Sequence, residues 1–205
     1  MAFDQLATQE DIEITIKTLS ERNIEAIVVD DKEAALAKIK ELIPSDVSVM
    51  NGSSTTLEQI GLIDYLKSDQ HPWNNLHAAI VNEKDEVKQA NLRKVSVLSD
   101  YYLGSVHALS MTGEFVIASN TGSQMPHIVF TSPNLIFVVG TQKIVSNLSE
   151  AMKRLQEYVI PKEDQRMMKE YGVGTNPNKI LIFNGEHKMM GRKVRMILVK
   201  EPLGF

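Results

Sequence analysis

The chain has 205 residues, of which 43% are hydrophobic and 23% charged, and its formal net charge is −4. This length and apolar content allow a buried core, so we expect one globular domain over residues 1–205, and the negative charge disfavours sequence-independent binding to nucleic acid. The absence of cysteine excludes disulfides, cysteine-ligated zinc, thiol catalysis and iron–sulfur clusters held by cysteines of this chain.

The N-terminal quarter alternates helical and strand patterns. Its first residues lack the basic start and apolar core of a signal peptide, and no later run is long enough to span a bilayer, so we expect a cytoplasmic location. Ile12, Ile16 and Leu19 recur at helical spacing among charged neighbours. The patterns predict a helix at 8–22, a strand at 24–29, a helix at 32–43 and a strand at 47–50. This order is typical of a parallel sheet covered by helices.

A polar loop follows the second of these strands and precedes a helical pattern that starts at Leu57. The loop reads Asn51-Gly52-Ser53-Ser54-Thr55-Thr56, and free backbone N–H groups at such a junction favour an anion. It matches neither the Walker motif nor the dinucleotide fingerprint. The alternative is structural: Thr55 caps the helix and Glu58 completes a capping box. Both interpretations stay open at this point.

The region from 57 to 98 is mostly helical in pattern. The only tryptophan, Trp73, lies in a polar loop, where an aromatic side chain that anchors the loop to the core is favoured over a pocket wall. Residues 76–98 then predict a helix whose charges alternate in sign, as on a solvated face.

Residues 100–143 carry the densest group of polar candidates. Two β-prone runs, 105–109 and 114–118, flank a short connection typical of a hairpin. The apolar run 135–139 shows no alternation, which is typical of a strand buried on both faces. Polar residues therefore gather at the ends of buried strands, where open α/β sheets bind ligands. We expect the loops at 52–56 and 120–124 to converge on one cleft.

Few side chains in this stretch can transfer protons. Glu114 and His107 flank the hairpin turn and are the candidate catalytic residues, because a carboxylate in a crevice can act as a base or nucleophile. The alternative for Glu114 is a solvated side chain, and for His107 and His127 a structural role. Lys143 directly follows the buried strand and would complement a bound carboxylate or phosphate. Since no histidine or acidic pair has ligand spacing, we expect no metal and no cofactor.

The C-terminal part contains one more helix and two strands. A helix is expected at 148–158 and should end at Pro161, with a turn-rich segment from there to 178. The runs 180–183 and 193–199 predict a C-terminal strand pair at about 179–200. The segment between these two strands is basic, which is typical of a solvent-exposed edge of a β-sheet.

Several motifs occur in an order that resembles the lactate utilisation (LUD) domain family, which includes lactate utilisation protein C and the LUD portion of protein B. They are residues 49–61, Ala108-Leu109 with Thr112-Gly113, Asn120-Thr121-Gly122, and Val138-Val139-Gly140 with Lys143-Ile144-Val145. The resemblance runs from the first helix to Pro161. It implies an α/β fold, a three-layer α/β/α sandwich with a mainly parallel sheet, as in ribose-5-phosphate isomerase, glucosamine-6-phosphate deaminase and the CoA transferases.

The chain departs from the family pattern at three places. Relatives tend to carry an acidic residue where this chain has Met111, Asn-Arg where it has Ser123-Gln124, and Asn where it has Gln142. These differences remove one carboxylate and one guanidinium from the expected site.

The resemblance implies a non-redox component of L-lactate utilisation, in which lactate is oxidised to pyruvate beside iron–sulfur partner subunits. The alternative is a small-molecule enzyme or sensor that binds an organic acid, sugar phosphate or CoA ester. The expected partners are the iron–sulfur subunits and a small anionic ligand, without nucleic acid or membrane, and a homo-oligomer is left open. The expected ligand-binding residues are Gly52, Ser53, Ser54, Thr55, Thr56, Thr112, Gly113, Asn120, Thr121, Gly122, Ser123, Gln124 and Lys143.

Overall fold

The computed structural model describes residues 3–68 and 70–205, and its strands form two sheets. The strands are β1 (Ile24–Val29), β2 (Ser48–Asn51), β3 (Asn74–Asn75), β4 (Tyr101–Gly104), β5 (Ala108–Ser110), β6 (Phe115–Ser119), β7 (Asn134–Gly140), β8 (Ile144–Val145), β9 (Lys179–Phe183) and β10 (Lys193–Val199). The α-helices are α1 (Gln9–Glu21), α2 (Lys32–Leu42), α3 (Thr55–Gln59), α4 (Leu62–Lys67), α5 (Leu76–Asn82), α6 (Glu86–Val95), α7 (Leu148–Arg154) and α8 (Ile160–Tyr171).

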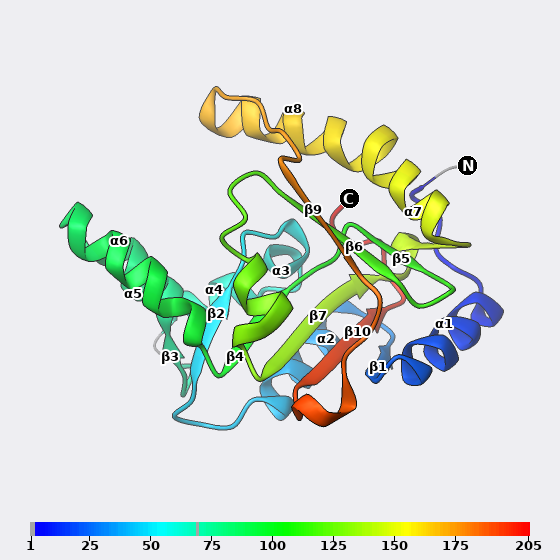
Figure 1. Cartoon of the computed structure of the whole chain (residues 1–205), viewed down its shortest axis with the longest axis horizontal. Coiled ribbons are helices and arrows are strands. Elements are labelled where there is room, and N and C mark those ends of the chain that lie inside the picture. The colour runs from blue at the N-terminus through cyan, green and yellow to red at the C-terminus, as the bar shows by residue number, and fades with distance from the viewer. Residues whose placement is uncertain (1–2, 69) are drawn as a thin grey trace.

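The larger sheet has the strand order β1-β10-β7-β4-β2-β3, and each of these neighbouring pairs runs parallel. Helices lie on both of its faces, which gives the predicted three-layer α/β/α sandwich (Figure 1). The smaller sheet has the order β8-β5-β6-β9 and packs beside α1 on one face of the larger sheet. No helix in the described ranges is long and apolar enough to cross a membrane.

Strand β7 lies in the middle of the larger sheet and is buried on both faces, as its unbroken apolar run predicts. Leu135, Phe137 and Val139 join the core beneath α1 and the smaller sheet. Ile136 and Val138 join the opposite core beneath α2, α3 and α4. Side chains alternate across a strand, so an apolar residue at every position places protein on both sides.

The N-terminal helix forms close to the predicted residues because both its start and its buried face are encoded locally. The Thr8 hydroxyl accepts from the Asp11 N–H at 3.2 Å, and the Asp11 carboxylate accepts from the Thr8 N–H at 3.0 Å, which completes a capping box. Ile12 and Leu19 are buried against the sheet.

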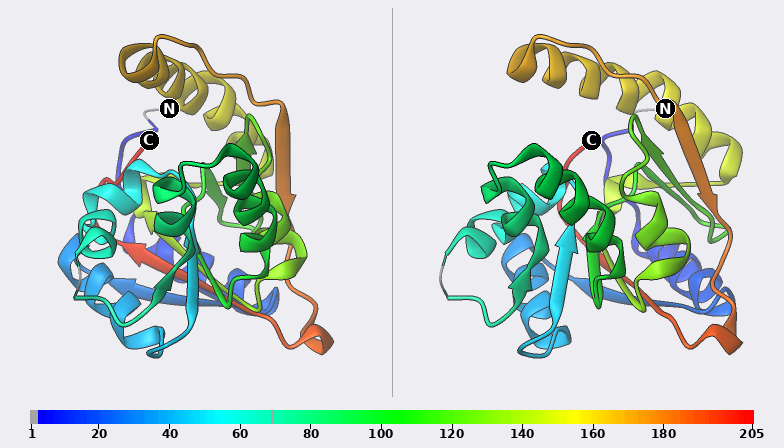
Figure 2. Two further views of the ribbon diagram at one scale, coloured as in Figure 1. Left: turned by 90° about the vertical axis from the view of Figure 1, so that its left-hand side faces the viewer. Right: turned by 60° about the vertical axis from the view of Figure 1, so that its left-hand side comes forward.

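The predicted end of a helix at Pro161 is wrong. The chain continues from α7 through a π-helical turn, Leu155–Val159, directly into α8. Pro161 lies at the start of α8, directly after the π-helical turn, where the regular α-helical hydrogen-bond pattern is already interrupted. The segment predicted to be turn-rich is therefore helical as far as Tyr171, and α8 projects over the end of the molecule (Figure 2).

The predicted C-terminal strand pair is also wrong, although both strands exist. Strand β9 pairs antiparallel with β6 at the edge of the smaller sheet, whereas β10 lies between β1 and β7. Burial explains the separation. Ile180 and Ile182 of β9 are exposed, while residues 196–199 of β10 are fully buried and need neighbours on both edges and faces.

Two further predicted helices are divided in the structure. The helix expected from Leu57 is split into α3 and α4 at Gly61, which has a φ of +77°. The helix expected at 76–98 is split into α5 and α6, and Asp85 caps the second part. The strand expected at 105–109 is shorter than predicted, because strand β5 begins only at Ala108.

Candidate functional site

A cavity of about 540 Å³ lies at the carboxyl edge of the larger sheet. The neighbouring strands β2, β4 and β7 all end there, and Thr56, Ser105 and Lys143 come shortly after these ends. Parallel strands bring their carboxyl ends to one edge, so three segments that are far apart in sequence meet at one place.

Lys143 lies at the bottom of this cavity and is 2% exposed. Its ammonium donates to Thr56 Oγ1 at 2.9 Å, to Ser105 Oγ at 3.1 Å and to the Val106 carbonyl at 3.2 Å. All three acceptors are neutral, and no carboxylate of residues 3–68 or 70–205 forms an ion pair with Lys143. Burial, with a smaller contribution from the positive charge of Arg154, lowers the pKa of Lys143 to about 7.

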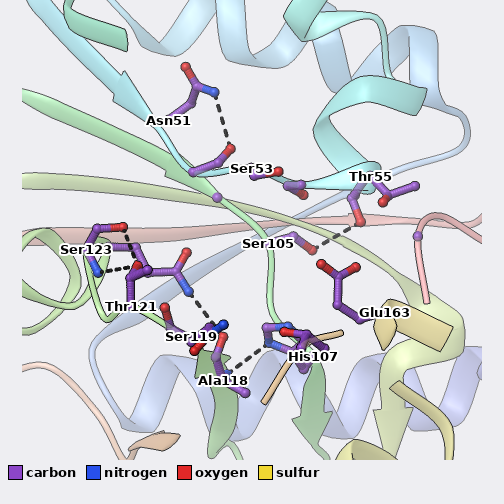
Figure 3. A pocket seen from close by; sticks show the side chains of 18 of the residues that line it. Asn51, Ser53, Thr55, Ser105, His107, Ala118, Ser119, Thr121, Ser123 and Glu163 are labelled. Atoms are coloured by element: carbon purple, nitrogen blue, oxygen red, sulfur yellow. Dashed lines mark hydrogen bonds between the residues drawn. The ribbon is translucent and has the colours of Figure 1, made fainter. Parts of the chain in front are cut away.

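The ammonium also orients the two hydroxyl groups. Because an ammonium only donates, Thr56 and Ser105 accept from it and direct their own protons elsewhere. The Thr56 hydroxyl donates to the Leu203 carbonyl at 3.4 Å. The Ser105 hydroxyl has Thr56 Oγ1 at 3.3 Å, a long contact that a ligand oxygen can replace (Figure 3).

His107 lines the same cavity as a neutral donor. Its Nδ1 accepts from the backbone N–H of Ala118 at 3.1 Å, so in the neutral ring the proton sits on Nε2. Burial, then the charges of Lys143 and Arg154, lower the pKa of His107 to about 3. Arg154, which is buried in α7, donates to the His107 carbonyl and so fixes this backbone. At neutral pH His107 offers an N–H rather than a basic nitrogen, which does not fit the predicted base chemistry.

The two polar loops line this one cavity, as the sequence predicts. All of residues 52–56 contribute, together with Asn120, Thr121, Ser123 and Gln124, whereas Gly122 is not among the lining residues. Next to the first loop, the Tyr102 hydroxyl of β4 donates to Gln124 Oε1 of the second loop at 3.2 Å. A Cβ at position 52 would lie 2.6 Å from that hydroxyl, so this close approach requires Gly52.

The capping-box interpretation of the first loop is wrong by one position. Ser54, rather than Thr55, caps α3, and its Oγ accepts from the Leu57 N–H at 3.3 Å. Thr55 is the first residue of the helix and lines the cavity. The capping role therefore explains Ser54 and leaves the other hydroxyls of the loop available.

The hairpin turn lies away from the cavity, contrary to the prediction. Thr112, Gly113 and Glu114 are not among the lining residues. The Glu114 carboxylate accepts from Arg22 at 2.6 Å and also from the Thr112 hydroxyl. Burial raises the pKa of Glu114, but hydrogen bonds, led by that from Thr112, and the Arg22 charge lower it overall. This ion pair joins α1 to the hairpin, and its partner is 92 residues away in sequence, so no local pattern indicates it.

Four charged or titratable lining residues were missed. Glu163 and Arg166 come from α8, His77 from α5 and Arg93 from α6. The Arg166 guanidinium donates to both carboxylate oxygens of Glu163, at 2.8 and 2.7 Å. Figure 3 draws Glu163 among the lining side chains, together with Ser105 and His107. Residues 163, 166 and 167 are spaced as on one face of a helix, which could have indicated Glu163 and Arg166. The prediction that the helix ends at Pro161 excluded this interpretation.

His127 has a structural role, which was the alternative interpretation of this residue. Its Nδ1 lies 3.1 Å from Ser99 Oγ and 3.0 Å from Ser132 Oγ, and its ring stacks on Tyr102. Burial lowers the pKa of His127 to about 4. Trp73 is likewise buried in the core and does not line the cavity.

Comparison with known proteins places the chain in a family. The sequence model of the LUD domain matches residues 12–198. The crystal structure of a DUF162 family protein from Deinococcus radiodurans is similar, with 13% identity, a TM-score of 0.57, and coverage of 95% of this chain and 99% of that one. At this identity the likeness concerns the fold alone. No curated protein matches the sequence, and the wider relationship to the CoA transferases stays a prediction. Because the match spans almost the whole chain, the protein belongs to the LUD domain family.

Proposed function

We propose that the protein binds a small organic acid in the cavity above Lys143, as a non-redox component of L-lactate utilisation in the cytoplasm. Membership of the LUD domain family supports a role related to lactate utilisation in general. The observation that carries the binding proposal is the buried ammonium of Lys143, whose hydrogen-bond acceptors are all neutral.

An anion is the ligand that best fits this arrangement. A buried charge is costly unless an opposite charge or several hydrogen bonds compensate it, and a carboxylate supplies both. The Ser105 hydroxyl and the His107 Nε2–H add neutral donors in the same cavity. Glu163, an acidic side chain that also lines the cavity, pairs with Arg166.

The amino-acid composition indicates which part of lactate oxidation this chain can perform and which part its partners must perform. Oxidation of lactate to pyruvate releases two electrons, and iron–sulfur clusters are one route for such electrons. A chain without cysteine has no thiolates to hold them. We therefore propose that partner subunits carry the clusters and that this chain contributes acid binding.

A second candidate is a small-molecule enzyme or sensor that acts on a larger acid. The cavity volume of about 540 Å³ favours it, because pockets of about 300–1,000 Å³ hold drug-sized ligands. Catalysis by the isolated chain would distinguish this candidate from the first.

Calorimetric titration tests the binding proposal. Lactate, phosphate and CoA are each titrated against the native protein, Lys143→Met and Lys17→Met, where Lys17 is an exposed lysine of α1. We expect Lys143→Met to weaken acid binding by roughly 1.5–3 kcal/mol, about tenfold to a hundredfold, because a charged hydrogen bond is lost. Lys17→Met should bind like the native protein. The absence of binding at millimolar concentration, or equal affinities in all three proteins, would refute the proposal.

A further inference from the structure

We infer that the cavity takes an extended polyhydroxy acid that carries a phosphate at the end opposite its carboxylate. This inference rests on the proposed function, because it assigns the carboxylate to Lys143 and Ser105. It goes beyond that function in the size of the ligand, in its hydroxyl groups and in its second anionic group.

The volume of the cavity is the first reason. Its 540 Å³ corresponds to roughly 18 water molecules at about 30 Å³ each. A three-carbon acid such as lactate fills only a small part of this space. The cavity is lined by residues of α5 and α6 and also by residues of α8, and Figure 2 shows how these helices are arranged.

A second cation on the α5–α6 side is the second reason. Arg93 lines the cavity from the last turn of α6, and its guanidinium donates to Gln89 Oε1 at 3.3 Å. Among the described residues no carboxylate forms an ion pair with it. The Arg93 charge acts on another lining residue, His77. The pKa of His77 is lowered first by burial and second by the positive charge of Arg93. A planar guanidinium with free N–H groups matches phosphate geometry.

The polar lining of the cavity is the third reason. It is rich in hydroxyl and amide side chains that come from the two polar loops, namely Asn51, Ser53, Thr55, Asn120, Thr121 and Ser123. Such groups both donate and accept, as the hydroxyls of a sugar acid do. A ligand with several hydroxyl groups therefore matches this lining better than one with an apolar body.

The charges on helix α8 are largely paired with one another. Glu163 and Glu170 both pair with Arg166, at 2.7 and 2.5 Å. Glu163, Glu170 and Arg166 together carry one net negative charge. Lys143 and Arg93 together carry two positive charges while Lys143 is protonated, which is the larger sum.

The test compares 6-phosphogluconate with gluconate, lactate and inorganic phosphate by calorimetry at pH 6.5 and constant ionic strength. The proteins are the native chain, Arg93→Gln, Lys143→Met and Lys94→Gln, where Lys94 is the next residue of α6 and does not line the cavity. We expect 6-phosphogluconate to bind at least about tenfold more tightly than gluconate. Arg93→Gln should abolish that advantage and leave gluconate unchanged, Lys143→Met should weaken both, and Lys94→Gln should weaken neither.

The outcomes separate this inference from the proposed function. If gluconate and lactate bind through Lys143 but the phosphate adds nothing, or if Arg93→Gln behaves like Lys94→Gln, the inference is wrong and the proposed function stands. If no acid binds the native protein, both are wrong. Melting temperatures of all four proteins establish that each variant is folded.

Discussion

Lys143 keeps an ammonium that is only 2% exposed, and this burial has a measurable cost. Its pKa falls from 10.5 to about 7, which corresponds to a penalty on the order of 5 kcal/mol for the protonated form. The unfolded chain retains the proton up to the higher value. The folded state is therefore destabilised most below pH 7, and the effect fades as the pH rises towards 10.5. A bound anion offsets this penalty, so the position suits binding better than stability.

The same ionisation predicts how lactate binding depends on pH. Lactate keeps its charge between pH 6 and 9, whereas Lys143 loses its own near pH 7. We expect the affinity to be constant below about pH 6.5 and to fall about tenfold for each pH unit above about pH 7.5, because the complex needs the protonated lysine. Calorimetry across this range measures the slope. An affinity that is flat up to pH 9 would exclude Lys143 as the titrating group.

At the scale of elements, the contact between α1 and the β5–β6 hairpin has a structural role. Arg22 donates to Glu114 and to the carbonyls of Thr112 and Asn184, at 2.6, 2.8 and 2.6 Å respectively. The pair is only partly exposed, and each member is also hydrogen-bonded to the backbone or to a hydroxyl. It ties the first helix to the smaller sheet without contact with the cavity lining.

Replacement of Glu114 tests this assignment. Glu114→Gln should lower the free energy of unfolding by about 1 kcal/mol, since the partly exposed pair loses its charge attraction while Thr112 can still hydrogen-bond. Lactate affinity should not change. Urea denaturation measures the first quantity and calorimetry the second. A loss of lactate binding in a folded variant would show that Glu114 contributes to ligand binding and would contradict the structural assignment.

Local sequence predicted the elements whose signals are local. The apolar run of β7, the capping residues of α1 and the polar loops after β2 and β6 each lie within a few residues of the structure that they specify. Lys143 was found because it directly follows β7. By contrast, the place of β10 between β1 and β7, the partner of Glu114, and the approach of Arg93 and Glu163 to the cavity depend on how distant elements pack. Pro161 misled because proline usually ends a helix, whereas here it follows a π-helical turn within a continuous helical segment.

At the scale of the whole molecule, the floor of the cavity depends on a segment remote from it in sequence. The Leu203 carbonyl accepts from Gln142 Nε2 at 2.7 Å, and the Gly204 N–H donates to Gln59 Oε1 at 2.6 Å. A Cβ on Gly204 would lie 2.4 Å from Thr56 Oγ1 and 3.1 Å from Lys143 Nζ. Residues 203–204 thus hold the lysine and its hydroxyl partners in place.

Gly204→Ala should therefore impair both stability and binding. Its φ of +63° is strained for alanine, which costs about 1 kcal/mol, and the methyl group also displaces Thr56. Gly191→Ala is the matched control, because its φ is +69° but nothing lies within 4 Å of the added Cβ. We expect both variants to melt at lower temperature and only Gly204→Ala to lose lactate affinity. Equal affinities in the two variants would contradict this role of Gly204.

The strand order β1-β10-β7 has a consequence for how the protein is made on the ribosome. Strand β1 is synthesised early, yet the neighbour that its register requires begins at Lys193, so Glu25 and its partner Arg195 are 170 residues apart. Until β10 emerges, β1 and β7 each present an open apolar edge. Contacts of such long range slow folding, and unpaired edges promote association between chains. The nascent protein is therefore most dependent on chaperones immediately before its last strand is complete.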